Sequence, residues 1–221
     1  METGNKKSRT DKEEFGLELL AEFASSEKLA SEFDFKPKGA VKYSGDMLNG
    51  NPHGNGNMTL PDGRIYQGEF FNGKPHGKVE RADIRNATYS GELFAGKLHG
   101  IGKIIKKNGE EYEGRFFDGS YHGHGKVTKE NKSYVGEFFR GRPHGMGEMT
   151  VGDIKSVGEF FAGKPIGKHK ITYNCGCMYQ ADCKSDKTSI HRLADDGVTL
   201  APPDSIHTTM KQHHAATCPK K

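Results

Sequence analysis

The chain has 221 residues, of which 33% are hydrophobic and none is tryptophan, so it is poor in the side chains that fill a compact core. Its 33 basic residues nearly balance 29 acidic ones, and a formal net charge of +4 gives no reason to expect a nucleic-acid-binding protein. No apolar run reaches the roughly 18 residues that a membrane-spanning helix needs.

The first 38 residues differ in pattern from the rest. Residues 1–10 are polar, and we expect them to be disordered and not a signal peptide. From residue 11 to 35, apolar side chains recur at helical spacing, with glutamates between them, which predicts an amphipathic helix. Pro37 and Gly39 then end it, so residues 11–38 are assigned to a helix and linker. The apolar positions are Phe15, Leu19, Phe23, Leu29 and Phe33.

From Tyr43 onward one pattern repeats every 22 or 23 residues. A fixed period of this size is typical of a repeat array, in which each unit packs on the next. Six units can be followed to residue 178, and a partial one starts at Tyr179. The units begin at Tyr43, Tyr66, Tyr89, Tyr112, Tyr134 and Ser156, and are called units one to six.

Residue types at fixed positions in the unit predict a β-hairpin. A full unit reads Tyr-x-Gly-x-Phe-Phe-x-Gly, then His-Gly-x-Gly at positions eleven to fourteen, as from Tyr134 to Gly147. Two short runs joined by a glycine-containing turn are typical of a hairpin. Alternation along a strand places the tyrosine and the fifth-position phenylalanine on one face, and the sixth position on the other.

This pattern resembles the MORN repeat, over about six units and residues 43–178. The resemblance implies an all-β fold, an elongated antiparallel hairpin array, here preceded by the short helix. It also implies no active site, and a scaffold or adaptor role for protein partners at cytoskeletal or membrane-associated structures, with some members linked to acidic lipids. We assign residues 39–183 to the array and 184–221 to a flexible polar tail.

Three units depart from the pattern. Unit one has Met47 and Leu48 in place of the phenylalanines. Unit two has Val79 at position fourteen, which predicts a bulge or kink in its return strand. Unit six has Ser156 for the tyrosine, Ile166 for the histidine and His169 for the late glycine. Terminal units of an array are often atypical because they cap it, and we interpret unit six in that way.

Histidines occupy the eleventh position of the first five units. Equivalent positions lie about 9.5 Å apart, two strands at ~4.8 Å each, so successive rings cannot share a metal ion. We expect each ring to bond turn backbone or to stack on a neighbouring ring. These residues are His53, His76, His99, His122 and His144, and together with Tyr43, Tyr66, Tyr89, Tyr112 and Tyr134 they form the predicted structural repeat.

The sixth position carries a second aromatic residue where the family's pattern is commonly polar. The sheet's curvature could bury these rings within the array. Otherwise they form an exposed ladder roughly 38 Å long, which a monomer seldom leaves uncovered. We predict a partner-binding surface made of Phe71, Phe94, Phe117, Phe139 and Phe161. The predicted N-terminal helix, about as long as this ladder, is the alternative occupant.

Basic residues beside the first turns favour a second function. They make an ordinary solubilising edge, or a contact for anionic lipid in which each charge contributes about 1 kcal/mol. The lipid-binding alternative uses Lys74, Lys97, Arg142 and Lys164.

The four cysteines do not form the framework of a secreted protein, which favours a cytosolic, reducing compartment. A zinc set of His169, Cys175, Cys177 and Cys183 is the less favoured alternative to buried or free thiols. No arrangement of residues suggests catalysis, and no cofactor is expected. The leading interpretation is a non-enzymatic scaffold, with a lipid-binding module, an accessory subunit of an enzyme, or a homodimer as alternatives.

Overall fold

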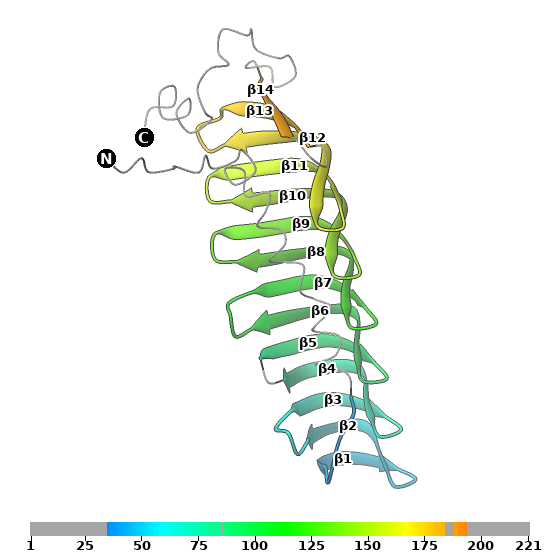
Figure 1. Ribbon diagram of the computed structural model, residues 1–221. Helices are drawn as coiled ribbons and strands as arrows, with labels where there is room; N and C mark the ends of the chain where they lie inside the picture. Colours follow the sequence, from blue (N-terminus) through cyan, green and yellow to red (C-terminus); the bar gives the residue numbers. More distant parts are fainter. Residues whose placement is uncertain (1–34, 85, 184–187, 194–221) are drawn as a thin grey trace, which may run out of the picture.

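The computed structural model describes residues 35–84, 86–183 and 188–193, which form one sheet of 14 antiparallel strands in sequential order. The strands stack along one axis from β1 to β14 (Figure 1), as the repeat predicts. Among the described residues, no helix is long and apolar enough to cross a membrane. The strands are β1 (Lys42–Leu48), β2 (Asn51–Thr59), β3 (Ile65–Phe71), β4 (Lys74–Ile84), β5 (Ala87–Phe94), β6 (Lys97–Lys106), β7 (Glu111–Phe117), β8 (Ser120–Lys129), β9 (Lys132–Phe139), β10 (Arg142–Val151), β11 (Ile154–Phe161), β12 (Lys164–Tyr173), β13 (Met178–Cys183) and β14 (Thr188–Arg192).

Two-residue turns close the hairpin of each unit. In the turn between β3 and β4, Asn72 and Gly73 have φ of 46° and 79°. Two successive positive φ values are typical of the type I′ turn, whose twist matches that of the flanking strands. Each such turn after the first also bonds to the previous unit, as where the Gly96 amide donates to the Pro75 carbonyl at 2.8 Å. The turns are therefore tied into a continuous edge.

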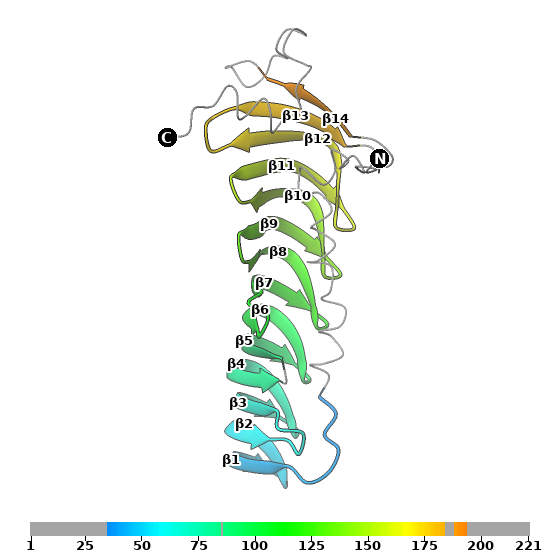
Figure 2. The ribbon, with the colours of Figure 1, turned by 60° about the vertical axis from the view of Figure 1, so that its left-hand side comes forward.

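A row of glycines crosses the sheet perpendicular to the strands. Within a unit the third and fourteenth positions are paired, as Gly91 with Gly102, and the next pairing in the row is Gly102 with Gly114. The hairpin register shifts beside this row, between Gly91 and Glu92 for example. Such bulges bend a strand, and the strands curve (Figures 1 and 2), so a single-layer sheet can enclose the side chains inside its bend.

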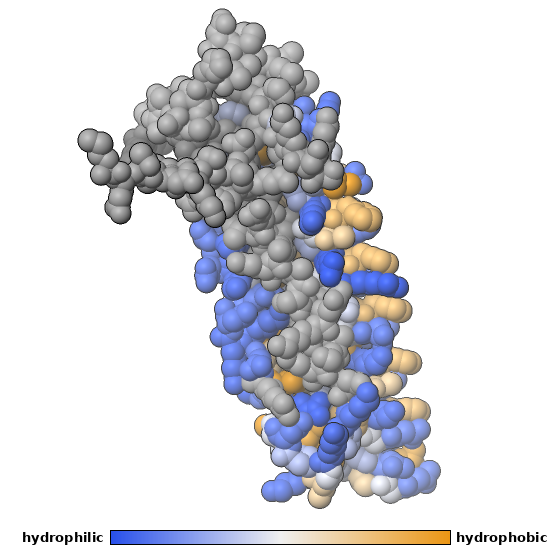
Figure 3. All heavy atoms as spheres, in the orientation of Figure 1, coloured by the Kyte–Doolittle hydropathy of each residue, from blue (hydrophilic) through white to orange (hydrophobic). Residues whose placement is uncertain are grey.

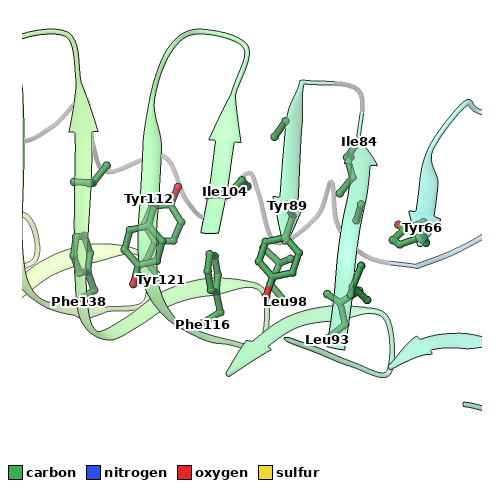
Figure 4. Close-up of a cluster of buried hydrophobic side chains, with 14 of the residues drawn as sticks. Tyr66, Ile84, Tyr89, Leu93, Leu98, Ile104, Tyr112, Phe116, Tyr121 and Phe138 are labelled. Carbon is green, nitrogen blue, oxygen red and sulfur yellow. The ribbon is translucent and has the colours of Figure 1, made fainter. Parts of the chain in front are cut away.

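The repeat tyrosines fill this bend. A Cβ atom on Gly102 would lie 2.4 Å from the Tyr89 hydroxyl oxygen, so the ring lies directly on the glycine row. The same hydroxyl donates a 2.7 Å hydrogen bond to the Glu92 carbonyl, which satisfies it inside the core. Tyr66, Tyr89, Tyr112 and Tyr134 are fully buried with the fifth-position side chains, and this tyrosine face is the core of the array. Figure 4 shows the first three of these rings.

Unit four adds a second ring to the core. Tyr121 occupies the tenth position, where four of the six units have proline, and stacks on Tyr112 at a centroid distance of 3.7 Å (Figure 4). Its hydroxyl donates to the buried carboxylate of Glu110, which also pairs with Lys106. The pair satisfies a carboxylate that would otherwise be costly to bury.

The irregularity predicted for unit two is confirmed. The pairing of β4 with β5 shifts register between Val79 and Ala82. The two residues between them on β4 lie opposite a single residue of β5, which is a bulge. Val79 and Ala82 are fully buried on the tyrosine face. The valine occupies the glycine row, and the bulge lets the strand accommodate it.

The array extends further than predicted at its C-terminal end. Strand β14 pairs antiparallel with β13, and the Leu193 amide donates to the Met178 carbonyl at 2.9 Å. The boundary predicted at residue 183 is therefore too early, because the partial unit from Tyr179 finds a pairing strand beyond it. The remaining residues assigned to the tail, 184–187 and 194–221, lie outside the described residues.

Candidate functional site

The sixth-position phenylalanines lie on the face opposite the tyrosines, as alternation predicts. Phe70 is 3% exposed inside the bend, whereas its neighbour Phe71 is 52% exposed. The alternative that curvature buries these rings is wrong, because the sheet bends toward the tyrosine face. Figure 3 shows apolar side chains running along one edge of the sheet. Phe71, Phe94, Phe117, Phe139 and Phe161 are between 47% and 59% exposed.

The repeat histidines lie between these phenylalanines. His99, for example, has ring centroids 5.7 Å from Phe94 and 5.3 Å from Phe117, tilted by 46° and 49°. The same contacts recur from His53 to Phe161 and make one uninterrupted column of alternating rings. We call this column the Phe–His ladder. It consists of Phe71, Phe94, Phe117, Phe139 and Phe161 with His53, His76, His99, His122 and His144.

The prediction that the histidines stack or bond turn backbone is therefore confirmed. His76 does both, because the Ala95 amide donates to its Nδ1 atom at 3.4 Å. A neutral imidazole that accepts at one nitrogen carries its proton on the other. His76 thus has Nε2–H as its donor, and the ring is only half-buried.

The basic residues stand directly across the hairpin from the ladder phenylalanines. Lys74 pairs in register with Phe71, and Lys164 with Phe161, and both lysines are exposed. Lys97 instead forms an ion pair with Asp118 of the next turn, and Arg142 is half-buried. The four residues therefore share an edge, but they do not make a uniform row of exposed charge.

Acidic residues at the fourth position have a structural role. The Ile101 amide donates to a carboxylate oxygen of Glu92 at 3.3 Å, and the Asn55 amide donates to Asp46 at 3.0 Å. Both amides follow a glycine with positive φ, where the hairpin register shifts. The carboxylates satisfy backbone donors that the bulge leaves without a strand partner.

The ladder face is broader at some units than the sequence analysis recognised. Ile101, Val135, Met146 and Val157 are also exposed, at the second and thirteenth positions, which point to the ladder face. Period-2 alternation could have found these residues, since the second and sixth positions have the same parity. They widen the apolar surface around units three, five and six.

The chain before β1 runs along the sheet on the other side. The ring of Phe35 makes an edge contact with Tyr66 at 5.7 Å, and a Cβ atom on Gly96 would lie 2.3 Å from its Cβ. Residues 35–41 therefore extend from the level of β5 and β6 back to β1 (Figure 2). Residues 11–34 of the helix predicted over 11–35 lie outside the described residues, and Phe35 lies on the tyrosine face.

His169 has a role that the sequence analysis missed. It is 1% exposed, and its ring lies across Gly158, where the other units place the tyrosine. Its Nε2–H donates to the Glu159 carbonyl at 2.9 Å, and its Nδ1 lies 3.1 Å from the Ser156 hydroxyl. Burial lowers the pKa of this imidazole. In unit six the buried ring therefore comes from His169 at position fourteen, and the small residue is Ser156 at position one, where the other units have tyrosine. Unit six is a full member of the array.

This position also removes His169 from the alternative zinc set. Its nitrogen atoms are engaged inside the core, and no group of three metal-ligating side chains lies together in the part of the chain that the structure describes. Cys175 is exposed and Cys183 is buried, and neither is disulfide-bonded. Cys177 is disulfide-bonded, which the prediction of free or buried thiols did not include.

A single-layer, sequentially ordered array of glycine-bent hairpins defines a class of repeat protein in which stacked aromatic residues take the place of a globular core. The MORN repeat family matches the chain at residues 43–63, 66–78, 89–111, 112–133 and 134–152, and the chain belongs to the MORN-repeat proteins. No curated protein matches it. Unit six falls outside the family matches, yet the structure continues the same hairpin geometry through β11 and β12.

Proposed function

We propose that this MORN-repeat protein is a non-enzymatic scaffold that binds a protein partner along the Phe–His ladder. The observation that carries the proposal is the asymmetry of the sheet. One face is buried inside the bend, whereas the other presents five phenylalanines that are about half exposed and aligned in one column. Exposed apolar surface of this extent and order marks interaction sites in proteins.

The cost of maintaining the ladder supports the same proposal. Polar residues at the sixth position would serve the hairpin equally well, because that position faces away from the core. Five solvent-facing aromatic rings favour self-association and contribute only ring contacts to stability. A partner that covers them explains their presence. In line with the family's scaffold role, we place that complex in the cytoplasm, at a cytoskeletal or membrane-associated structure.

Affinity capture with a matched control tests this function. Phe94→Ser with Phe117→Ser removes the centre of the ladder. Ile65→Ser with Ile105→Ser removes two exposed apolar side chains that lie outside it. We expect captured partners, identified by mass spectrometry and cross-linked to the ladder face, to be lost with the first variant and kept with the second. Capture that both variants retain equally would refute the proposal.

Lipid binding remains a second candidate, favoured only by the two exposed lysines beside the ladder, Lys74 and Lys164. We rank it lower because Lys97 is neutralised by Asp118 and Arg142 is half-buried. Flotation with phosphatidylserine vesicles at low salt decides this point. Binding that charge reversal of the four basic residues abolishes, but the ladder variant does not, would replace the protein-scaffold proposal.

A further inference from the structure

We propose that the segment bound by the Phe–His ladder is a proline-rich chain in the polyproline II conformation, with one residue of every three seated at each rung. This inference rests on the proposed function and specifies the partner's chemistry at the same site. Three properties of the ladder lead to it: its repeat distance, its width, and the hydrogen-bonding groups it presents.

The repeat distance of the ladder matches the pitch of a polyproline II helix. Adjacent ring centroids in the column lie 5.0 to 5.7 Å apart. One repeat is two strands, about 9.6 Å at ~4.8 Å per strand. A polyproline II helix advances about 9.3 Å in three residues, so its mismatch over the whole ladder is only about 1 Å. An α-helix that contacts each rung once in seven residues advances about 10.5 Å per rung, so its mismatch over the whole ladder is about 4 Å.

The ladder itself is a single column of rings, with further apolar side chains beside it at units three, five and six. On its outer side stand the position-nine residues Lys74 and Lys164, and on its inner side the carboxylates that cap the bulges, such as Glu92. An α-helix is about 10–12 Å across with its side chains and would cover both charged columns. A polyproline II chain is thinner and needs only a single file of apolar contacts.

A ladder histidine, His76, supplies a donor of the kind that such a chain requires. A polyproline II backbone has no internal hydrogen bonds, so its carbonyl oxygens need outside donors. His76 carries its free proton on Nε2, because the Ala95 amide donates to Nδ1. Its neighbours Phe71 and Phe94, with centroids at 5.6 and 5.0 Å, offer ring faces and edges for proline. The rung at His76 thus combines an apolar contact with a hydrogen-bond donor.

Charge sets the expected composition of the other positions. The lysines at the outer side of the ladder, Lys74 and Lys164, are exposed. The carboxylates on the inner side accept backbone amides, as Glu92 does from Ile101. An acidic residue on the outer side would therefore meet complementary charge at the first and last rungs, beside Lys74 and Lys164. The segment that fits best is a repeat of two prolines and one glutamate.

Synthetic peptides test this inference directly. The first peptide has five Pro-Pro-Glu triplets, to span the five rungs. The second has one extra proline in the middle, which keeps the conformation but shifts the later triplets by a third of a turn. The third is an amphipathic α-helical peptide of equal length and charge. Binding to the full chain is measured by titration calorimetry and by NMR shifts of backbone amides.

We expect the in-phase peptide to bind, and the shifted peptide to bind at least tenfold more weakly, because only part of it can sit in register. Phe117→Ser should weaken the in-phase peptide at least tenfold, whereas Ile105→Ser, with a similarly exposed side chain off the ladder, should not. Circular dichroism of both variants is the control for folding.

Each other outcome overturns the inference in a way that separates it from the proposed function. Ladder-dependent binding of the helical peptide, or equal binding of the in-phase and shifted peptides, overturns the polyproline II assignment and leaves the scaffold intact. A dimer that Phe117→Ser dissociates makes a second copy the occupant. Failure of all three peptides overturns the assignment, and if ladder variants also keep every captured partner, the proposed function falls with it.

Discussion

Unit six has Ser156 in place of tyrosine and His169 in place of glycine. The chain should tolerate the reversal of both replacements together, but not of either one alone. In units three to five a tyrosine lies on a position-fourteen glycine. In unit six His169 itself occupies position fourteen, lies over the position-three glycine Gly158, and takes over the tyrosine's hydrogen bond to the position-four carbonyl. Ser156→Tyr together with His169→Gly restores the arrangement of units three to five. We expect this double variant to be about as stable as the natural chain.

Each single substitution should be strongly destabilising. His169 is fully buried, makes two hydrogen bonds and contacts Phe160 at a centroid distance of 5.0 Å. His169→Gly empties that space and should cost about 3–4 kcal/mol. Ser156→Tyr places a ring where the imidazole already lies, which should cost about 1–3 kcal/mol or more. A near-neutral double variant then implies a coupling free energy of at least about 3 kcal/mol.

Guanidinium unfolding, followed by circular dichroism, measures these free energies, provided that the variants share one slope with denaturant. The control pairs His169→Gly with Tyr89→Ser, which removes a ring from unit three. Because these sites lie in different units and share no contact, their effects should add within about 0.5 kcal/mol. If Ser156→Tyr and His169→Gly also add, the two side chains do not compensate for each other and our account of unit six is wrong.

Three further predictions follow from the same core. Burial lowers the pKa of His169 from 6.5, so the unfolded chain binds more protons, and stability should fall as the pH drops through about 6.5; denaturation in a pH series should show this loss, and His169→Gln should reduce it. Phe116→Ala should cost about 3–5 kcal/mol and Phe117→Ala about 1 kcal/mol or less, since the first ring is buried and the second is exposed; similar losses would contradict the assignment of faces. Gly102→Ala should lower stability by about 1–3 kcal/mol because its Cβ meets the Tyr89 hydroxyl, and its melting temperature tests this; a neutral effect would show that the ring can move.

The candidate site could be predicted from the sequence because it depends on alternation along a strand. Phe70 and Phe71 are neighbours in the chain, and alternation alone assigns them to opposite faces. The period then aligns the equivalent residues of successive units in columns, and the histidines with them. What alternation does not give is which face is enclosed, since a flat sheet would expose both.

Only the tertiary structure decides which face of the sheet is enclosed, and how His169 compensates for the missing tyrosine of unit six. Bulges beside the glycine row bend every hairpin toward the tyrosine face, and only their accumulated effect leaves the ladder outside. Likewise Ser156 and His169 are 13 residues apart and meet only through the register of β11 with β12. Phe35 reaches Tyr66 across the same bend. Repeat, strands and faces are local properties of the backbone and are readable in the sequence, whereas contacts across the bend depend on the summed geometry of many units.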